Sequence, residues 1–101
     1  MLFYEKVTLD IYHVILYLAY AYPFYEPVDH VALKLADYTT IITRPMDLGT
    51  IRKKLANSSY EEPEEVADDV KLMFNNCFVY NPDTHEVVAM GKKLEAIFET
   101  R

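Results

Sequence analysis

Residues 63–82 read PEEVADDVKLMFNNCFVYNP and carry the clearest helix signal in the chain. Pro63 is favoured in the first turn of a helix, and the two glutamates after it complement the positive end of the helix dipole. Apolar residues then recur at steps of three and four, which predicts one buried face. We expect this helix to end near Tyr80, because Asn81 and Pro82 are typical of a turn. The apolar face consists of Val66, Val70, Met73, Phe74 and Cys77.

Further helices are predicted on both sides of this one. Toward the N-terminus, Asp47 is a suitable N-cap for a short helix that ends near Asn57. Toward the C-terminus, Asp83 and Glu86 have the spacing of a capping box, which predicts the start of a last helix. A first helix is expected to end at Pro23. The apolar positions of these helices are Leu48, Ile51 and Leu55 in the short one, Val87, Met90, Leu94 and Ile97 or Phe98 in the last, and Val7, Ile11, Val14, Ile15 and Leu18 in the first.

The segment between the first two predicted helices, residues 23–45, is a long connection with an unusual composition. Its prolines, Pro23, Pro27 and Pro45, oppose regular helix, yet the segment is rich in apolar side chains that must pack against something. Connections of this length are uncommon in compact domains and are usually functional. The sequence contains no useful strand-type alternation and no internal repeat. We therefore expect an all-α helix bundle with a long apolar loop between helices one and two, and we expect the function to lie in the loops.

The bulk composition narrows the class of protein. The chain has 101 residues, the usual size of one domain, so residues 1–101 are expected to form a single module. Its 16 acidic and 10 basic side chains give a net charge of −6, which favours basic partners over nucleic acid. Cys77 is the only cysteine and no signal-peptide pattern opens the chain, so a reducing compartment, nuclear or cytoplasmic, is expected. No apolar run reaches the roughly 20 residues of a membrane span, so no membrane association is expected.

The sequence lacks the usual patterns of catalysis and metal binding. The helix predicted after the last turn starts like a zinc-protease helix at His85, but the second histidine would stand where the residue is Ala89. Cys77 and His85 could in principle form a nucleophile pair, but Cys77 lies on an apolar helix face, where a free cysteine is usually a small buried side chain. With two glycines in all, the chain has no phosphate-binding loop. We therefore expect no enzyme activity, no metal and no cofactor.

Several short motifs follow one another in and around the long loop and the turn after the third helix. In chain order they are Tyr22-Pro23-Phe24, Pro27-Val28-Asp29, Asp37-Tyr38, Pro45-Met46-Asp47-Leu48-Gly49-Thr50-Ile51, Met73-Phe74-Asn75-Asn76-Cys77 and Tyr80-Asn81-Pro82. In this order they resemble a bromodomain, and the resemblance covers about residues 20–98. The ending, residues 81–90, looks most like the second bromodomain of the BET subfamily.

The resemblance implies a left-handed four-helix bundle in which the long loop and the short loop between the last two helices shape a pocket for acetyl-lysine. Asn81 would donate its side-chain N–H to the acetyl carbonyl, and Tyr38 would hold a water that bridges to the same oxygen. Pro23 and Phe24 would form a shelf, and His85 would stand at the rim. The remaining residues that the resemblance assigns to the site are Val28, Leu33, Leu35 and Val87 on an apolar wall, together with Tyr80 and Cys77.

The chemistry of acetyl-lysine agrees with such a site. An acetylated lysine is a neutral amide on an apolar stem, and it needs one hydrogen bond inside an apolar slot. A neutral hydrogen bond contributes about 0.5–1.5 kcal/mol of binding free energy. The desolvation of an unpaired ammonium in the same slot costs on the order of several kcal/mol. Desolvation therefore provides the discrimination against unmodified lysine. We expect micromolar to sub-millimolar binding, because one side chain and its neighbours bury little surface.

The same residues also have purely structural interpretations. An Asn-Pro pair after a helix is often only a turn, so Asn81 taken alone does not establish a site. Tyr38 could be a packed aromatic residue in the loop, and the apolar wall could be partly core. His85 could be an ordinary exposed residue in the first turn of a helix. These alternatives are compatible with a binding role for some of the residues.

Two features depart from the usual pattern of the subfamily. Tyr22 stands where many members carry a tryptophan on the shelf. Residues 11–21 are apolar or aromatic nearly all round, whereas the family usually shows lysines on the outer face. A helix of this kind is normally buried, so we expect the face with Tyr12, Leu16 and Tyr20 to contact a second copy or another protein.

The leading interpretation is a nuclear reader of acetylated histone tails, with no direct contact to nucleic acid. The alternative is a helical scaffold that no longer reads acetyl-lysine and works through the apolar first helix. An acidic surface near the start of the third helix would attract basic tails, although such a surface can equally be ordinary solvation. Its members are Glu61, Glu62, Glu64, Glu65, Asp68 and Asp69.

Overall fold

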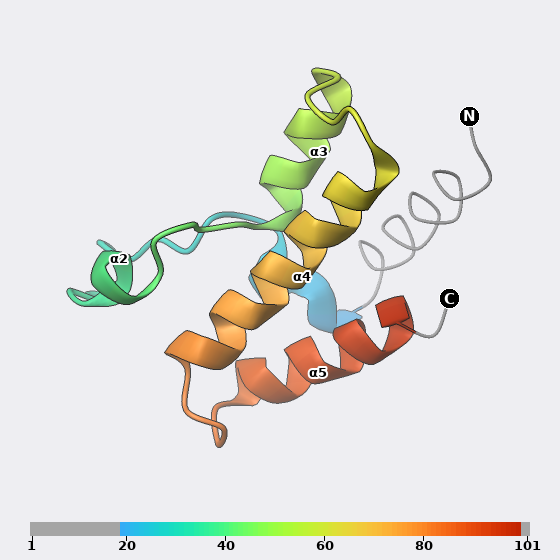
Figure 1. Ribbon diagram of the computed structural model, residues 1–101. Coiled ribbons are helices and arrows are strands. Elements are labelled where there is room, and N and C mark those ends of the chain that lie inside the picture. The colour runs from blue at the N-terminus through green and yellow to red at the C-terminus, as the bar shows by residue number, and fades with distance from the viewer. Residues whose placement is uncertain (1–18, 100–101) are drawn as a thin grey trace.

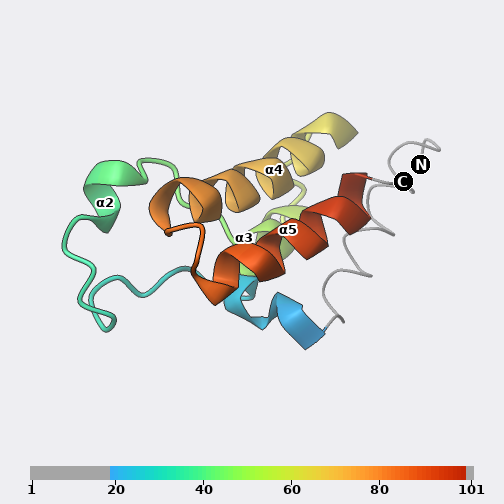
Figure 2. The same cartoon turned by 90° about the horizontal axis from the view of Figure 1, so that it is seen from below.

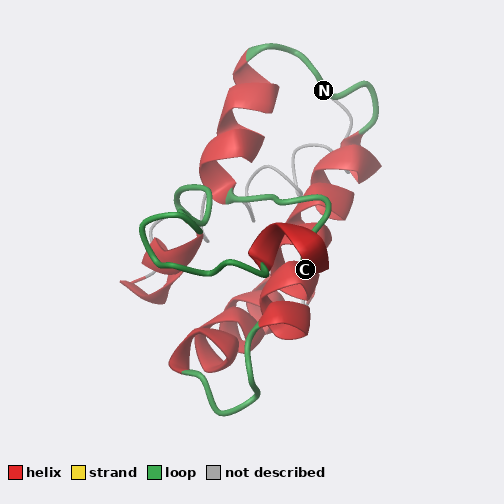
Figure 3. Cartoon of the chain, turned by 90° about the vertical axis from the view of Figure 1, so that its left-hand side faces the viewer, coloured by secondary structure: helices red, strands yellow, loops and turns green. Residues whose placement is uncertain are grey.

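The computed structural model describes residues 19–99 (Figure 1). Within this range the chain forms helices and loops and no strand (Figure 3). The predicted all-α, four-helix fold is confirmed, whereas the first predicted helix, with the face of Tyr12, Leu16 and Tyr20, lies almost entirely outside the described residues. The elements in chain order are the 3-10 helix η1 (Ala19–Phe24) and the α-helices α2 (Tyr38–Ile41), α3 (Leu48–Ala56), α4 (Pro63–Tyr80) and α5 (Glu86–Glu99).

Helix α4 is the central element, since it packs against both α3 and α5, and α5 also packs against η1 (Figure 2). It begins and ends as the sequence predicts. Pro63 occupies its first position, and the Glu62 N–H donates to Glu65 Oε1 at 2.9 Å, as in a capping box. At the other end the Asn81 N–H donates to the Cys77 carbonyl at 3.1 Å, and Asn81 leaves the helix in an extended conformation.

Helix α3 also begins at its predicted cap. The buried Asp47 side chain accepts a hydrogen bond from the Thr50 N–H at 2.9 Å, which satisfies a free donor of the first turn. The helix ends in a Schellman motif, in which Ser58 has a φ of 55° and the Ser59 N–H donates to the Lys54 carbonyl at 2.9 Å. The predicted end near Asn57 is therefore confirmed.

The cap of α5 corrects a prediction. Asp83 was expected to cap this helix, but it is exposed and outside the first turn. The His85 N–H closes a turn on the Pro82 carbonyl at 2.9 Å, and this turn places His85 directly before the helix. His85 Nδ1 accepts a hydrogen bond from the Val87 N–H at 3.0 Å, so an imidazole caps α5 in place of a carboxylate.

The start of the long loop differs from the prediction. The first helix was expected to end at Pro23, but Pro23 lies inside η1, because its fixed φ fits a 3-10 turn. After η1 the chain runs out to one side of the three longer helices and carries the short helix α2 at its far end, where Tyr38 meets Tyr80 at the C-terminal end of α4 (Figure 1 and Figure 2). A segment predicted to lack regular structure therefore contains α2.

The loop also contains a closed turn at residues 29–35. Asp29 Oδ1 accepts a hydrogen bond from the Ala32 N–H at 3.0 Å, and the Leu35 N–H donates to the His30 carbonyl at 2.8 Å. Lys34 occupies the left-handed region with a φ of 58°, as the closing residue of a second Schellman motif. Local polar contacts thus hold the loop in shape.

The core lies between α3, α4 and α5 and is closed by η1. Phe24 of η1 meets Phe74 of α4 edge to face, with ring centroids 5.7 Å apart. The predicted apolar face of α4 is buried except for Cys77, which is only partly buried. The side chains that form the core are Ala21, Phe24, Leu48, Ile51, Val66, Ala67, Val70, Met73, Phe74, Leu94 and Phe98.

One ion pair ties α3 to the first half of α4. Lys54 Nζ lies 2.6 Å from Asp69 Oδ2, the same oxygen accepts a hydrogen bond from the Tyr60 hydroxyl at 2.6 Å, and the ammonium lies over the Tyr60 ring. Asp69 is buried, so it does not belong to the exposed acidic surface on which it was placed from the sequence. None of the described helices is long and apolar enough to cross a membrane.

Candidate functional site

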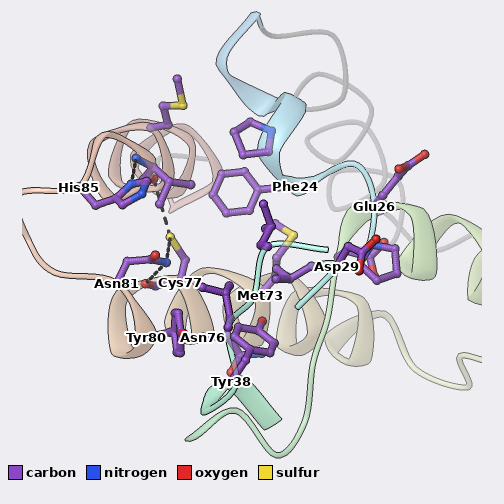
Figure 4. Close-up of a pocket in the computed structure, with 18 of the residues that line it drawn as sticks. Phe24, Glu26, Asp29, Tyr38, Met73, Asn76, Cys77, Tyr80, Asn81 and His85 are labelled. Carbon is purple, nitrogen blue, oxygen red and sulfur yellow. Dashed lines mark hydrogen bonds between the residues drawn. The ribbon is translucent and has the colours of Figure 1, made fainter. Parts of the chain in front are cut away.

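A pocket with a volume of about 910 Å³ opens between the loop that follows η1, the C-terminal end of α4 and the N-terminal end of α5 (Figure 4). Its lining is mainly apolar, with a few amide, hydroxyl and carboxyl groups. Every residue that the sequence assigned to a site lies in this lining. They are Pro23, Phe24, Val28, Leu33, Leu35, Tyr38, Cys77, Tyr80, Asn81, His85 and Val87.

Asn81 is held at the inner end of the pocket by its own helix. Its side-chain Nδ2 donates to the Cys77 carbonyl at 3.0 Å, and the same nitrogen lies 3.9 Å from Cys77 Sγ (Figure 4). An amide nitrogen carries two N–H groups. One of them fixes the rotamer of Asn81, while the other faces only a weak sulfur acceptor and can be given to a ligand. The extended backbone of Asn81 results from the proline that follows it.

Cys77 forms part of the pocket wall and also packs against the core. Its Sγ donates a weak hydrogen bond to the Val87 carbonyl at 3.7 Å and so links α4 to α5. Burial raises the pKa of the Cys77 thiol, and the hydrogen bond from Asn81 lowers it by less. The thiol is therefore neutral at physiological pH, which suits an apolar wall and not a nucleophile.

Tyr38 is the first residue of α2, and its ring is buried between two other rings. The ring meets Tyr80 edge to face with centroids 4.8 Å apart and stacks on His30 with centroids 6.0 Å apart. Burial, and to a smaller extent the nearby Cys77, raises the pKa of Tyr38. Within residues 19–99 no group hydrogen bonds to the Tyr38 hydroxyl, so this group is available to a ligand or to a water.

Tyr80 connects the end of α4 to the loop. Its hydroxyl donates to Asp37 Oδ1 at 2.7 Å, and this hydrogen bond raises the pKa of Tyr80. Nearby, Asn76 Nδ2 donates to the Arg44 carbonyl at 2.8 Å. These two contacts fasten both sides of α2 to α4, and they determine the distance between Tyr38 and Asn81.

The apolar wall has an exposed half and a buried half. Val28 and Leu33 are 39% and 63% exposed, so they are rim residues and not part of the core. Leu35 and Val87 are partly buried, whereas Phe24 is buried against Phe74 and serves the core as well as the shelf. Some residues of the wall, such as Val28 and Leu33, therefore have no core role, whereas Phe24 serves both the core and the pocket.

The pocket has members that the sequence did not assign to a site. Met73 was predicted only as a core residue, yet it also forms part of the pocket floor. Asn76 lies in a motif that the sequence singled out, but its bond to a carbonyl 32 residues away carries no local signal. The other additional lining residues are Tyr22, Tyr25, Glu26, Pro27, Asp29, Met46, Asp47, Pro82, Glu86 and Met90.

Among the described residues, the pocket lining contains acidic side chains and neither lysine nor arginine. Its carboxylates are those of Glu26, Asp29, Asp47 and Glu86. No group of three or more potential metal ligands occurs among residues 19–99. An apolar slot with one available amide donor can hold a neutral carbonyl group on an apolar stem, and an acidic mouth favours a ligand with positive charge nearby.

Comparison with known protein families agrees with this arrangement. The family model named Bromodomain matches residues 10–93, which is most of the 101-residue chain. The match includes the whole long loop, α2, α3, α4 and the first half of α5. Members of this family are modules that read acetyl-lysine and are not enzymes. The chain therefore belongs to the bromodomain family.

Proposed function

We propose that this bromodomain binds acetylated histone tails, with Asn81 as the anchor of the acetyl group. The observation that carries the proposal is the geometry of Asn81: its amide lies in the pocket lining, is fixed by the Cys77 carbonyl at 3.0 Å, and keeps one N–H for a ligand. The hydroxyl of Tyr38 is the second polar group available to the same carbonyl, through a bridging water.

Discrimination between acetylated and unmodified lysine would come mainly from desolvation. Cys77 contacts Asn81, whereas Leu35 and Val87 are apolar members of the same pocket lining, and the neutral thiol adds no charge. An unpaired ammonium in this apolar slot would lose its hydration, which costs on the order of several kcal/mol. The acetyl amide avoids this cost and gains one hydrogen bond.

The charge of the pocket mouth supports a basic partner. Glu26 and Glu86 are exposed carboxylates on the two sides of the lining, and the whole chain carries a net charge of −6. Histone tails have lysines and arginines beside their acetylation sites, so they would be steered toward this mouth. A chromatin role in the nucleus, without direct contact to nucleic acid, follows from this choice of partner.

We also propose the second bromodomain of the BET subfamily as the nearest type. The support is the stretch from Asn81 to Met90, which looks like that type, and its His85 lies in the pocket lining before α5. Tyr22 is the departure from the type on the shelf. The single-module organisation over residues 1–101 is part of the same proposal.

Calorimetric titration with acetylated and unacetylated histone-tail peptides tests the function. The wild type should bind the acetylated peptides in the micromolar to sub-millimolar range, and Asn81→Ala should weaken binding at least about tenfold, since a buried partner loses its hydrogen bond. Asn75→Ala is the matched control, because Asn75 is an exposed asparagine on the same helix and outside the pocket.

The two outcomes separate the candidate functions. Acetyl-dependent binding that Asn81→Ala removes and Asn75→Ala preserves would support a reader that uses this pocket. Absence of binding to every acetylated peptide would reject the reader and favour the scaffold that acts through the first helix. Equal loss in both variants would reject Asn81 as the anchor.

A further inference from the structure

Three aromatic side chains from separate parts of the chain form a row beside the pocket. His30 comes from the closed turn in the loop, Tyr38 from the start of α2, and Tyr80 from the end of α4. The His30 and Tyr38 rings lie nearly parallel, at 14°, with centroids 6.0 Å apart, and Tyr38 meets Tyr80 at 70° and 4.8 Å. Tyr38 and Tyr80 line the pocket, whereas His30 does not.

The backbone around His30 is held in place independently of the ring contact. Its carbonyl accepts a hydrogen bond from the Leu35 N–H at 2.8 Å, and its own N–H donates to the Val28 carbonyl at 3.1 Å. Asp29 caps the same turn by accepting from the Ala32 N–H at 3.0 Å. The imidazole is therefore presented to Tyr38 from a fixed position, and not from a free loop.

The Tyr38 side chain, in contrast, is held by ring contacts and by no hydrogen bond from its hydroxyl to the described residues. Tyr38 opens a helix of four residues, which is too short to be stable without packing. The hydrogen bonds that tie α2 to α4 come from Asp37 and Arg44, on either side of this helix. The Tyr38 ring is held by Tyr80, which meets it at 70°, and by His30, which stacks on it at 14°. The removal of His30 would free the ring face on which it stacks.

We infer that His30 is a positioning residue of the binding site: by stacking on Tyr38 it keeps the hydroxyl of Tyr38 directed at the pocket. His30 itself does not touch the ligand. The effect on binding rests on the proposed acetyl-lysine function, since Tyr38 acts there on the bound carbonyl. The stack itself is independent of any ligand, so the two proposals can be tested apart.

The test compares three substitutions on the same turn by calorimetry with an acetylated histone-tail peptide. His30→Ala removes the ring and should weaken binding about 3- to 10-fold, the range of an aromatic pair. His30→Phe keeps a flat ring and should remain within about twofold of the wild type. Val31→Ala is the control, because Val31 is the neighbouring residue, is 76% exposed and takes part in no ring contact.

A second measurement needs no ligand. In NMR spectra of protein with ¹³C-labelled tyrosine, His30→Ala should shift the ring signals of Tyr38. His30→Phe should leave these signals near their wild-type positions, because it keeps a stacked ring. If His30→Ala does not fold, as loss of amide dispersion would show, His30→Leu takes its place, because it keeps apolar volume without a flat ring.

The results decide between the two proposals. If the wild type binds no acetylated peptide, the proposed function fails, while the Tyr38 signals still report on the stack. Unchanged binding and unchanged Tyr38 signals in His30→Ala would overturn the positioning role. The positioning role would also be overturned if His30→Phe lost as much affinity for the acetylated peptide as His30→Ala.

Discussion

Cys77 lies in the pocket wall beside Asn81, and burial raises the pKa of its thiol above the ordinary 9.0. Only the thiolate is alkylated, so a raised pKa lowers the rate at neutral pH. We expect iodoacetamide to modify Cys77 more slowly than a free cysteine at pH 7.5, and the rate to rise as the pH passes the raised pKa. An acetylated peptide should slow the reaction further. Mass spectrometry measures the rate directly, because the chain has one cysteine.

The raised pKa of Cys77 also makes the stability of the folded protein depend on pH. The folded state prefers the protonated thiol of Cys77, so this residue contributes stability below the pKa of the unfolded chain and loses it as the pH rises through the folded pKa. Alkylation at the rate of a free thiol, with no protection by the peptide, would contradict the place of Cys77 in the site. Cys77→Ser provides the unreactive control.

Tyr22 is the residue that departs from the proposed subfamily pattern on the proposed shelf. It lines the pocket and is 60% exposed, so it stands at the mouth and not in the core. A phenol offers a smaller flat surface than an indole and adds a hydroxyl that can hydrogen bond. We therefore expect this mouth to contact the residues beside the acetyl-lysine differently from a tryptophan at the same position.

At the scale of elements, the approach of α3 to the end of η1 depends on Gly49. The Gly49 N–H donates to the Tyr25 carbonyl at 3.0 Å, and a Cβ on Gly49 would lie 2.6 Å from the same oxygen. Gly49→Ala should therefore destabilise the fold by about 1–3 kcal/mol, although alanine is the better helix former. Urea unfolding measures this loss.

Gly91→Ala is the matched control for this prediction. Its Cβ would meet only side-chain atoms, at 3.0 Å from Phe78 Cε1 and 3.3 Å from Phe24 Cζ, and these rings can shift. Alanine in the middle of α5 also gains about 1 kcal/mol of helix propensity, so the net loss should be smaller than at Gly49. Equal losses at the two sites would show that backbone contact at Gly49 is not the deciding factor.

Short-range hydrogen bonds fix the ends of the helices and one turn of the long loop. Asp47, Asp29 and His85 each accept a hydrogen bond from a backbone N–H near the start of a helix or turn. Two residues in the left-handed region, Lys34 and Ser58, close the turn at residues 29–35 and the end of α3. The bonds of Asp29 and the turn at Lys34 lie inside the loop and hold its shape, whereas Asp47, Ser58 and His85 fix the ends of α3 and the start of α5.

At the scale of the whole molecule, charge should control the encounter with the ligand. The chain carries a net charge of −6, and the described pocket lining includes Glu26 and no lysine or arginine. We expect the affinity for a lysine-rich acetylated peptide to fall several-fold as NaCl rises from about 50 to about 500 mM, because salt screens this attraction. A peptide without basic residues should show a smaller change.

Two neutralising substitutions localise this effect. Glu26→Gln should reduce the salt dependence, since Glu26 lies at the mouth. Glu64→Gln removes the same charge at the opposite end of α4, about 24 Å along the helix from Tyr80, and should have little effect. The same loss in both variants would mean that net charge, and not the mouth, steers the peptide.

Much of the fold could be predicted from the sequence because its signals are local. The limits of α4, the Asp47 cap of α3 and the apolar faces depend on residues a few positions apart. The residues that the resemblance assigned to a site all lie in the lining of one pocket, but Met73 and Asn76 of the same lining were not assigned to it. The α5 cap was predicted wrongly, because the spacing of Asp83 and Glu86 does not reveal how the turn before His85 folds.

Only the tertiary structure decided how the parts of the site meet. The Tyr80 hydroxyl reaches Asp37 across 43 positions of sequence, and Asn76 reaches Arg44 across 32. No periodicity or cap predicts such contacts, because they form only when the loop folds back on α4. The amino-acid sequence by itself determined where α3, α4 and α5 form and which residue types are available to a ligand. The packing of η1, α3 and α5 around α4 decided which of them share a pocket, because burial of their apolar faces fixes the distances between segments far apart in the chain.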